Sequence, residues 1–475
     1  MDFDAIVTGG RVFVRGAFER LDIGLREGTI AAVGQPAAFG QAEGVPTIDA
    51  ASLLVFPGVI DSHVHARAPS HPEREDFASI SRAAAAGGVT AVIEMPISEP
   101  PAINGAIVRD RVRLAEAEAC VDVGFYASAA TLQRADLVSS IDAGALAFKG
   151  FLQHVPAGRE SEFAGLCLPT MGDAMEAFAL LAEFGLPCVF HPEDESIYQR
   201  LESRLRAAGR RDGRAHAESR PDYVEAVSVG SLLRLAEHFG VHLHVPHVSS
   251  AMTVALIREA KARGAPVTAE TCPHYLQFDD SALARLGPYA KCNPPFKQRK
   301  DIEALWDGVR DGTIDTLASD HSPFTIAEKD AAKDDIWLGP PGFPGTEVLA
   351  PFAIGAALDG RLSWPRLNAL LFENPARVFD LWPARGAIQP GANADLLFFD
   401  PAPRGVFDHR ALHNKVPASA VIWDGVPRHG SVVRTIRRGE TIYADGAVVG
   451  AGGGRQLTRE QIDQTGAIAG EAVHD

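Results

Sequence analysis

The stretch from Leu54 to His65, LVFPGVIDSHVH, carries an apolar run into two histidines that are separated by one residue. Such a run is typical of a buried strand, and side chains alternate across a strand. His63 and His65 therefore leave the strand on the same face, where both imidazoles can hold one metal ion. Alone, the pattern fits equally well two histidines at a solvent-exposed strand end. The rest of the chain has to supply further ligands if this is a metallohydrolase.

The composition limits the classes of protein that the chain can represent. With 475 residues and 46% hydrophobic content, it is long enough for one large α/β domain with a smaller satellite, or for two domains. A formal charge of −16 without a run of lysine and arginine argues against a nucleic acid or an anionic membrane as partner. The five scattered cysteines lack C-x-x-C spacing, which favours a reducing cytoplasm over a disulfide framework or a structural zinc site. No signal peptide or apolar segment near the ~20 residues of a membrane span is evident.

The central part of the chain alternates between strand-like and helical patterns. Including the strand that ends at His65, eight apolar runs can be counted, the later ones at 89–95, 121–126, 145–152, 187–191, 241–247, 267–270 and 314–319. Amphipathic helical patterns fit between most of them, for example at 77–86, 173–184, 224–238 and 251–263. Eight βα units over roughly 320 residues predict a TIM-type (β/α)8 barrel.

The two ends of the chain have a different residue pattern. Residues 1–55 read as short strands separated by turns, and similar strands return in residues 384–450. This distribution predicts a small split β-sandwich domain, built from both chain ends, around a barrel at residues 56–383. Residues 451–475, which begin near a run of three glycines, are expected to form a mobile C-terminal extension.

Polar residues close the predicted strands at the end where barrels carry their chemistry, the carboxyl end. They are His63 and His65 on the first strand, Lys149 on the fourth, His191 on the fifth, His247 on the sixth and Asp320 on the eighth. Each later histidine alone fits a surface or loop position. Together, at matching strand ends, the six residues predict a metal centre at one mouth of the barrel.

Lys149 is the unusual member of this set, because an ammonium ion is costly to bury and repels a metal ion. One interpretation is a salt-bridged lysine. The other is that its neutral amine adds CO2 to form a carbamate, a bidentate anion that bridges two divalent ions. His63, His65 and Asp320 would then hold one ion, and His191 and His247 the other, with a water molecule between them.

Further motifs extend the pattern along nearly the whole chain. They are AGGVT at 86–90, HVSS at 247–250, ETCPHYL at 270–276, KCNPP at 291–295, SDHSP at 319–323 and GANADL at 391–396. With them, the chain resembles the amidohydrolase superfamily, and within it the cyclic amidohydrolases, which include dihydroorotases, allantoinases and hydantoinases. The resemblance implies a cyclic amide as small-molecule substrate, two divalent metal ions, usually zinc, a carboxylated lysine at Lys149, and a homodimer or homotetramer. It also implies that Asp320 is both a ligand and the catalytic residue that moves protons.

The substrate contacts that the resemblance implies are Arg67, His274 and Asn293. Arg67 matches the arginine by which dihydroorotases hold a carboxylate; alternatively it pairs with Glu73, Glu75 or Asp76. His274 and Asn293 would contact ring carbonyl or imide groups; alternatively they are loop residues satisfied by backbone groups.

Ile97 stands where dihydroorotases have an asparagine, and an apolar side chain cannot hydrogen-bond a carboxylate. We therefore expect ring opening of an allantoin- or hydantoin-like substrate by hydroxide attack, with dihydroorotate as the alternative. A phosphotriesterase-like activity would use the same metal centre. A non-catalytic, hydantoinase-like assembly protein is disfavoured because all six ligand positions are filled. The loop at 324–344 is expected to border the mouth.

Overall fold

The computed structural model describes residues 2–39, 44–450 and 452–459. At its centre lies a parallel sheet of eight strands in the order β15-β14-β13-β12-β11-β10-β9-β8. The strands are β8 (Val59–Val64), β9 (Val89–Glu94), β10 (Asp122–Ser128), β11 (Ala147–Phe151), β12 (Cys188–His191), β13 (Leu243–Val245), β14 (Val267–Thr271) and β15 (Thr316–Leu317). The first and last strands meet just beyond β15, where the His65 N–H donates to the His321 carbonyl at 2.8 Å. The predicted (β/α)8 barrel is confirmed.

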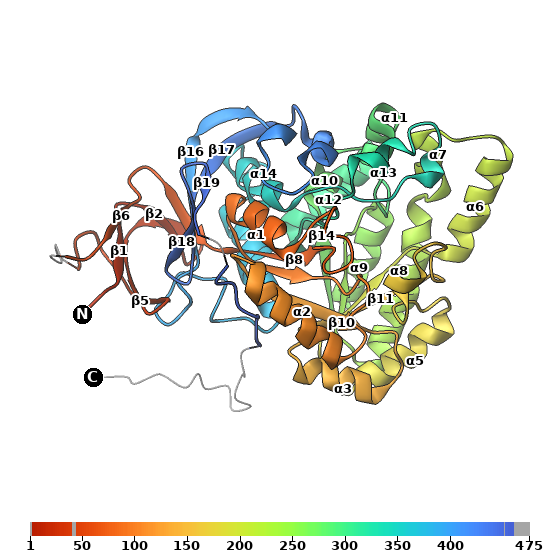
Figure 1. Cartoon of the computed structure of the whole chain (residues 1–475), viewed down its shortest axis with the longest axis horizontal. Helices are drawn as coiled ribbons and strands as arrows, with labels where there is room; N and C mark the ends of the chain where they lie inside the picture. The colour runs from red at the N-terminus through yellow and green to blue at the C-terminus, as the bar shows by residue number, and fades with distance from the viewer. Residues whose placement is uncertain (1, 40–43, 451, 460–475) are drawn as a thin grey trace.

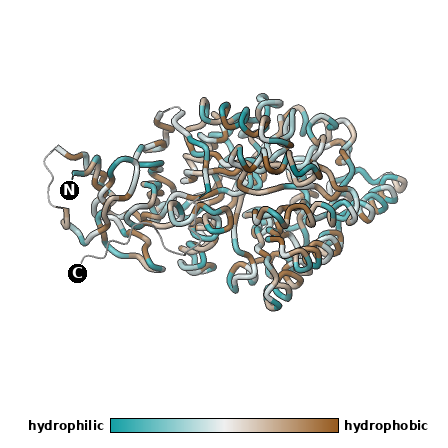
Figure 2. Tube along the Cα trace, turned by 90° about the horizontal axis from the view of Figure 1, so that it is seen from below, coloured by the Kyte–Doolittle hydropathy of each residue, from teal (hydrophilic) through white to brown (hydrophobic). Residues whose placement is uncertain are grey.

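Helices between the strands cover the outside of the barrel (Figure 1). Those expected from the sequence are α1 (Phe77–Ala86), α5 (Met171–Leu181), α8 (Asp222–Phe239) and α9 (Ala251–Ala262). Capping side chains determine where these helices begin. Asp76 accepts the Ser79 N–H at 2.7 Å at the start of α1, and Thr170 caps α5, which begins two residues before the expected start at residue 173. Hydrophilic segments lie mainly toward the periphery of the barrel in Figure 2, as expected for helices with one buried face.

Strands from both chain ends form the smaller domain. One sheet has the order β5-β4-β1-β6 and the other β19-β18-β17-β16-β7-β2-β3. The strands are β1 (Ala5–Thr8), β2 (Arg11–Val14), β3 (Ala17–Arg20), β4 (Asp22–Arg26), β5 (Thr29–Gly34), β6 (Thr47–Asp49), β7 (Leu54–Pro57), β16 (Leu396–Val406), β17 (Pro427–Arg437), β18 (Glu440–Ala444) and β19 (Ala447–Val448). Figure 1 shows these red and blue strands together beside the barrel. The sheet domain is thus present, and its predicted boundaries at residues 55 and 383 stay predictions.

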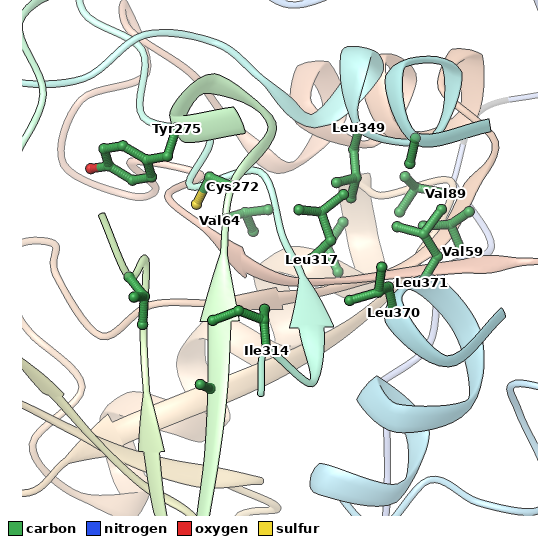
Figure 3. Close-up of a cluster of buried hydrophobic side chains, with 14 of the residues drawn as sticks. Val59, Val64, Val89, Cys272, Tyr275, Ile314, Leu317, Leu349, Leu370 and Leu371 are labelled. Carbon is green, nitrogen blue, oxygen red and sulfur yellow. The ribbon is translucent and has the colours of Figure 1, made fainter. Parts of the chain in front are cut away.

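A buried apolar cluster joins the first and last barrel strands (Figure 3). Val59 of β8 and Leu317 of β15 pack in one core with Leu349 of α14 (Thr346–Leu358) and Leu371 of η3 (Ala369–Glu373). Burying each of these side chains is worth about 1.5–3 kcal/mol. The cluster therefore stabilises the closure that places the ends of β8 and β15 side by side.

Part of the predicted C-terminal extension is docked on the barrel. The Gly454 N–H donates to the Ala119 carbonyl at 2.8 Å, and the Leu457 N–H donates to the Val123 carbonyl at 2.9 Å. The Leu457 side chain is buried in the same cluster as Ile60 and Ile93 from inside the barrel. Residues 452–459 thus pack against the amino-terminal end of β10, whereas residue 451 and residues 460–475 of the extension lie outside the described residues.

In the described part of the chain, no helix is long and apolar enough to cross a membrane. All five cysteines are free thiols.

We predict that Leu457→Ala lowers the free energy of unfolding by about 2–5 kcal/mol, because a buried leucine is replaced by a cavity. Urea unfolding measures the change. Leu338→Ala is the matched control, since the Leu338 side chain is 67% exposed and its loss should cost about 0.5 kcal/mol or less. Equal effects of the two substitutions would contradict the docking of residues 452–459.

Candidate metal centre

All six residues predicted as ligands line one cavity of about 940 Å3 at the carboxyl end of the barrel strands. His63 and His65 lie at the end of β8, Lys149 within β11, His191 at the end of β12, His247 just after β13 and Asp320 just after β15. The strand-end rule used on the sequence therefore corresponds to a real convergence of side chains. The assignment of each residue as a ligand stays a prediction.

The first group of donors consists of His63, His65 and Asp320. Oδ1 of Asp320 lies 3.3 Å from Nε2 of His63 and 3.4 Å from Nε2 of His65. One donor atom from each of the three residues lies within 4.8 Å of the other two. Imidazole nitrogens and carboxylate oxygens are preferred ligands of zinc, so this group has the chemistry and spacing of a metal site.

The second group consists of His191 and His247. Nδ1 of His191 faces Nε2 of His247 at 3.2 Å. The two groups adjoin each other, since the ring centroids of His63 and His247 are 5.4 Å apart. The donors are therefore arranged as two neighbouring sets in one cavity.

Lys149 lines the same cavity and is 1% exposed. In the part of the chain that the structure describes, no carboxylate lies within 4.0 Å of its ammonium group, so the alternative of a salt-bridged lysine is not observed. Burial lowers the pKa of Lys149 to about 8, although the negative charges of Asp320 and Glu270 oppose this shift. An unpaired ammonium at this depth is costly, whereas its neutral amine is suited to covalent modification.

Glu270 of β14 orients the first histidine, a role that the sequence analysis did not assign. Its Oε1 lies 2.8 Å from Nδ1 of His63, and its Oε2 accepts the Ser62 hydroxyl at 3.0 Å. With Nδ1 engaged, Nε2 of His63 faces Asp320. Burial raises the pKa of Glu270, but the His63 and His244 charges outweigh it and leave the pKa below its usual value. The signal in the sequence was an acidic residue near the carboxyl end of the seventh strand.

The backbone around Asp320 is held by buried hydrogen bonds. Asp320 has a positive φ of 47°, which is uncommon for a residue other than glycine. On one side, Asp61 accepts the Ser319 N–H at 3.0 Å and the Thr346 hydroxyl at 2.7 Å. On the other side, Nδ1 of His321 accepts the Gly345 N–H at 3.2 Å. Residues at the start of α14 thus fix the strand end that carries Asp320.

The charge state of Asp320 follows from its neighbours. Burial raises the pKa of Asp320, but nearby His63 and His65 more than compensate and lower it to about 2. Asp320 is therefore a carboxylate at neutral pH, available as a ligand and as a proton acceptor.

Of the predicted substrate contacts, Arg67 and Asn293 line the cavity. Arg67 donates to the Ser322 hydroxyl, and its guanidinium lies 4.5 Å from the ring centroid of Phe324. No ion pair between Arg67 and any described carboxylate is present, so the predicted alternative of pairing with nearby acidic residues is not observed. Burial lowers the pKa of Arg67 to about 9. Oδ1 of Asn293 is buried without a partner among the described residues.

His274 is placed differently. It is absent from the described cavity lining and packs against the rings of Tyr275, Phe296 and Phe343. Neither ring nitrogen has a hydrogen-bond partner in the described part of the chain, and burial lowers the pKa of His274 to about 4. The predicted loop does border the mouth, since Phe324, Trp337 and several residues between them line the cavity.

Comparison with known proteins agrees with this geometry. The model of the amidohydrolase family matches residues 54–442. An allantoinase from Rubrobacter xylanophilus is 38% identical over 455 residues, which cover 95% of this chain and 97% of that protein. An L-hydantoinase from Paenarthrobacter aurescens is 32% identical over 467 residues, or 97% of this chain and 99% of that protein.

Among solved structures, the L-hydantoinase (dihydropyrimidinase) from Arthrobacter aurescens superposes with a TM-score of 0.91 at 32% identity. The match covers 96% of this chain and 100% of that one. The chain belongs to the amidohydrolase family.

Glu94, the last residue of β9, gives the site a measurable pH dependence. Its Oε2 accepts the Ala66 N–H at 2.6 Å, beside His65. Burial raises the pKa of Glu94 to about 8, although the Arg111 charge opposes this shift. The pKa of Glu94 is therefore higher in the folded chain than in the unfolded chain, where it is 4.5. The protonated Glu94 contributes fully to the stability of the fold below pH 4.5, and this contribution is lost as the pH rises through about 8.

We therefore predict that the free energy of unfolding of the wild-type protein falls, because of Glu94, by at most about 1.4 kcal/mol per pH unit between about pH 5 and about pH 8. Glu94→Gln, whose amide oxygen can still accept the Ala66 N–H, should lack this part of the pH dependence. Urea unfolding at several pH values measures the slope. Glu303→Gln, at an exposed position, is the control and should keep the wild-type slope. An unchanged slope in the Glu94 variant would show that this carboxyl group ionises normally.

Proposed function

We propose that this chain hydrolyses a ring amide or ureide, allantoin- or hydantoin-like, at a binuclear metal centre. The observation that carries the proposal is the convergence of two donor groups and an unpaired buried lysine on one cavity. The relatives named allantoinase and L-hydantoinase, which match nearly the whole chain, support the class of substrate.

The donor set fits two divalent ions, and its imidazole nitrogens and carboxylate oxygen suit zinc. His63, His65 and Asp320 would hold one ion, and His191 and His247 the other. A carbamate on Lys149 would complete both sites. The ammonium first loses one proton to become the neutral amine. The amine nitrogen then forms a bond to CO2 and loses a second proton, so a buried cation becomes an anion. That change removes the cost of an unpaired ammonium and supplies the negative charge that two cations require.

The bound ions would lower the pKa of a water molecule and polarise the ring carbonyl. Asp320 is placed to accept a proton from this water as its oxygen attacks the carbonyl carbon. The carboxylic acid form of Asp320 then returns the proton to the departing ring nitrogen. One carbon–oxygen bond forms and the ring carbon–nitrogen bond breaks, which gives a ring-opened acid.

Dihydroorotate is the second candidate substrate, and a specific observation favours it. The buried guanidinium of Arg67 has no carboxylate partner among the described residues and lines the cavity together with Asn293, as a site for an anionic substituent would. Ile97 lines the same cavity and offers no hydrogen bond, which favours the ureide or hydantoin. Cytoplasmic location and assembly into a homodimer or homotetramer stay predictions.

A turnover screen of the zinc-loaded protein, prepared with bicarbonate, tests the proposed function. The substrates are allantoin, 5-substituted hydantoins, dihydrouracil and dihydroorotate. We expect hydrolysis of allantoin or a hydantoin, and its loss in Lys149→Ala, which cannot carry a carbamate. Preference for dihydroorotate would show that Arg67 outweighs the apolar Ile97. If no ring is opened although two ions are bound, the proposed substrate class is wrong.

Asp320→Asn tests the proton-transfer role separately from metal binding. The amide oxygen of asparagine can still act as a ligand, but the side chain cannot accept the proton of the attacking water. We expect two metal ions per chain, as in the wild type, and a fall in kcat of about 10²–10⁴-fold. Metal analysis and steady-state kinetics on the same preparation measure both quantities. Activity close to that of the wild type would rule out the assigned role.

A further inference from the structure

His191 differs from the other histidines of the candidate centre in the nitrogen that it presents. His63 and His65 face Asp320 with Nε2, whereas His191 faces His247 with Nδ1. Its Nε2 points the other way and lies 3.0 Å from Oε2 of Glu193, a residue that is 2% exposed. The two residues are joined through Pro192, whose ring restricts the intervening backbone.

This contact determines which nitrogen of His191 is free. A neutral imidazole has one N–H and one lone pair, and an ionised carboxylate can only accept. The proton therefore belongs on Nε2, where it is donated to Glu193, and the lone pair on Nδ1 faces the centre. We call the ring nitrogen that faces away from the centre the outer nitrogen. A carboxylate that accepts a hydrogen bond from the outer nitrogen of a histidine commonly fixes the tautomer and makes the inner nitrogen a stronger ligand.

Glu193 is itself held by a buried cation. Nε of Arg220 lies 3.5 Å from Oε1 of Glu193, and the guanidinium of Arg220 stacks 4.1 Å from the ring centroid of Tyr198 of α6 (Glu195–Ala207). The Arg220 carbonyl accepts a hydrogen bond from the buried Lys297 ammonium, which ties down the backbone at this point. A series of polar and charged side chains thus connects His191, through Glu193, to Arg220 just before α8.

Each donor group of the centre has its own supporting carboxylate. Glu270 engages the outer nitrogen of His63, and Glu193 engages that of His191. The outer nitrogens of His65 and His247 are buried without a partner among the described residues. Each donor group therefore has one histidine that is oriented by a carboxylate, and Glu193 provides this for the pair His191 and His247.

We infer that Glu193, held in place by Arg220, is the positioning residue that presents Nδ1 of His191 to the second metal ion. The inference rests on the proposed function, because it assumes that a metal ion binds between His191 and His247. It makes Glu193 a determinant of the affinity for one ion of the pair, without contact to the substrate.

Stepwise metal binding tests the inference on the full-length chain. The metal-free protein is titrated with Zn2+ in bicarbonate against a competing chelator, and with Co2+ while its visible absorption is followed. In Glu193→Ala, we expect the affinity for one of the two ions to fall about 10- to 100-fold, with a changed Co2+ spectrum for that ion and an unchanged affinity for the other. Glu193→Gln keeps an oxygen that can accept the Nε2 proton, so most of the affinity should return.

Glu195→Ala is the matched control. It removes a buried carboxylate two residues further along the chain, which contacts His154 rather than a candidate ligand, and both ions should bind as in the wild type. Wild-type affinity for both ions in Glu193→Ala would overturn the inference, and so would equal loss of both ions, which indicates general unfolding. If the wild-type protein binds fewer than two ions, the binuclear proposal fails and the inference fails with it.

Discussion

The closure of the barrel between β8 and β15 is the constraint on which the candidate centre depends. His63 and His65 are separated from Asp320 by about 250 residues of sequence. Yet the backbone hydrogen bond from His65 to His321 places both imidazoles within 3.4 Å of one carboxylate oxygen of Asp320. The apolar cluster of Val59, Leu317, Leu349 and Leu371 stabilises this closure from outside the sheet. Parallel strands place their carboxyl ends at one rim, so every other donor arrives at the same mouth.

Buried charge is the second feature that organises the site. Glu270, Glu193 and Asp61 are buried, and each has a polar partner. Glu270 and Glu193 each contact a histidine, Arg220 lies beside Glu193, and Asp61 accepts hydrogen bonds from Ser319 and Thr346. Lys149 has no carboxylate within 4.0 Å among the described residues, and the more distant Asp320 and Glu270 only partly offset the cost of its burial. A domain is stable by only about 5–15 kcal/mol, so an uncompensated ammonium at this depth is a substantial cost. In our account, conversion of Lys149 to an anion between two cations removes that cost and creates the centre in the same step.

Much of the architecture is predictable from the sequence because it depends on local patterns. The apolar runs and the polar residues at their carboxyl ends gave the barrel and the cavity-lining set. The roles of Glu270 and Glu193 are not predictable from periodicity. The contact of Glu270 with His63 depends on how distant strands are placed in the barrel, and that of Glu193 with His191 depends on the turn after β12. The docking of Leu457 was missed because the preceding glycines indicate a flexible tail. Arg67 was given possible acidic partners nearby in sequence, but its left-handed backbone, with φ of 59°, leads to Ser322 and Phe324 instead.

The most direct test of the account is carbon-13 NMR of the metal-loaded protein after exchange with ¹³C-bicarbonate. We predict a carbamate resonance in the wild-type protein that is absent from Lys149→Arg, since the guanidinium keeps the positive charge but does not form a stable carbamate. Two bound metal ions per chain without a carbamate resonance would contradict the assigned role of Lys149. The centre would then have to be held by histidines and Asp320 alone.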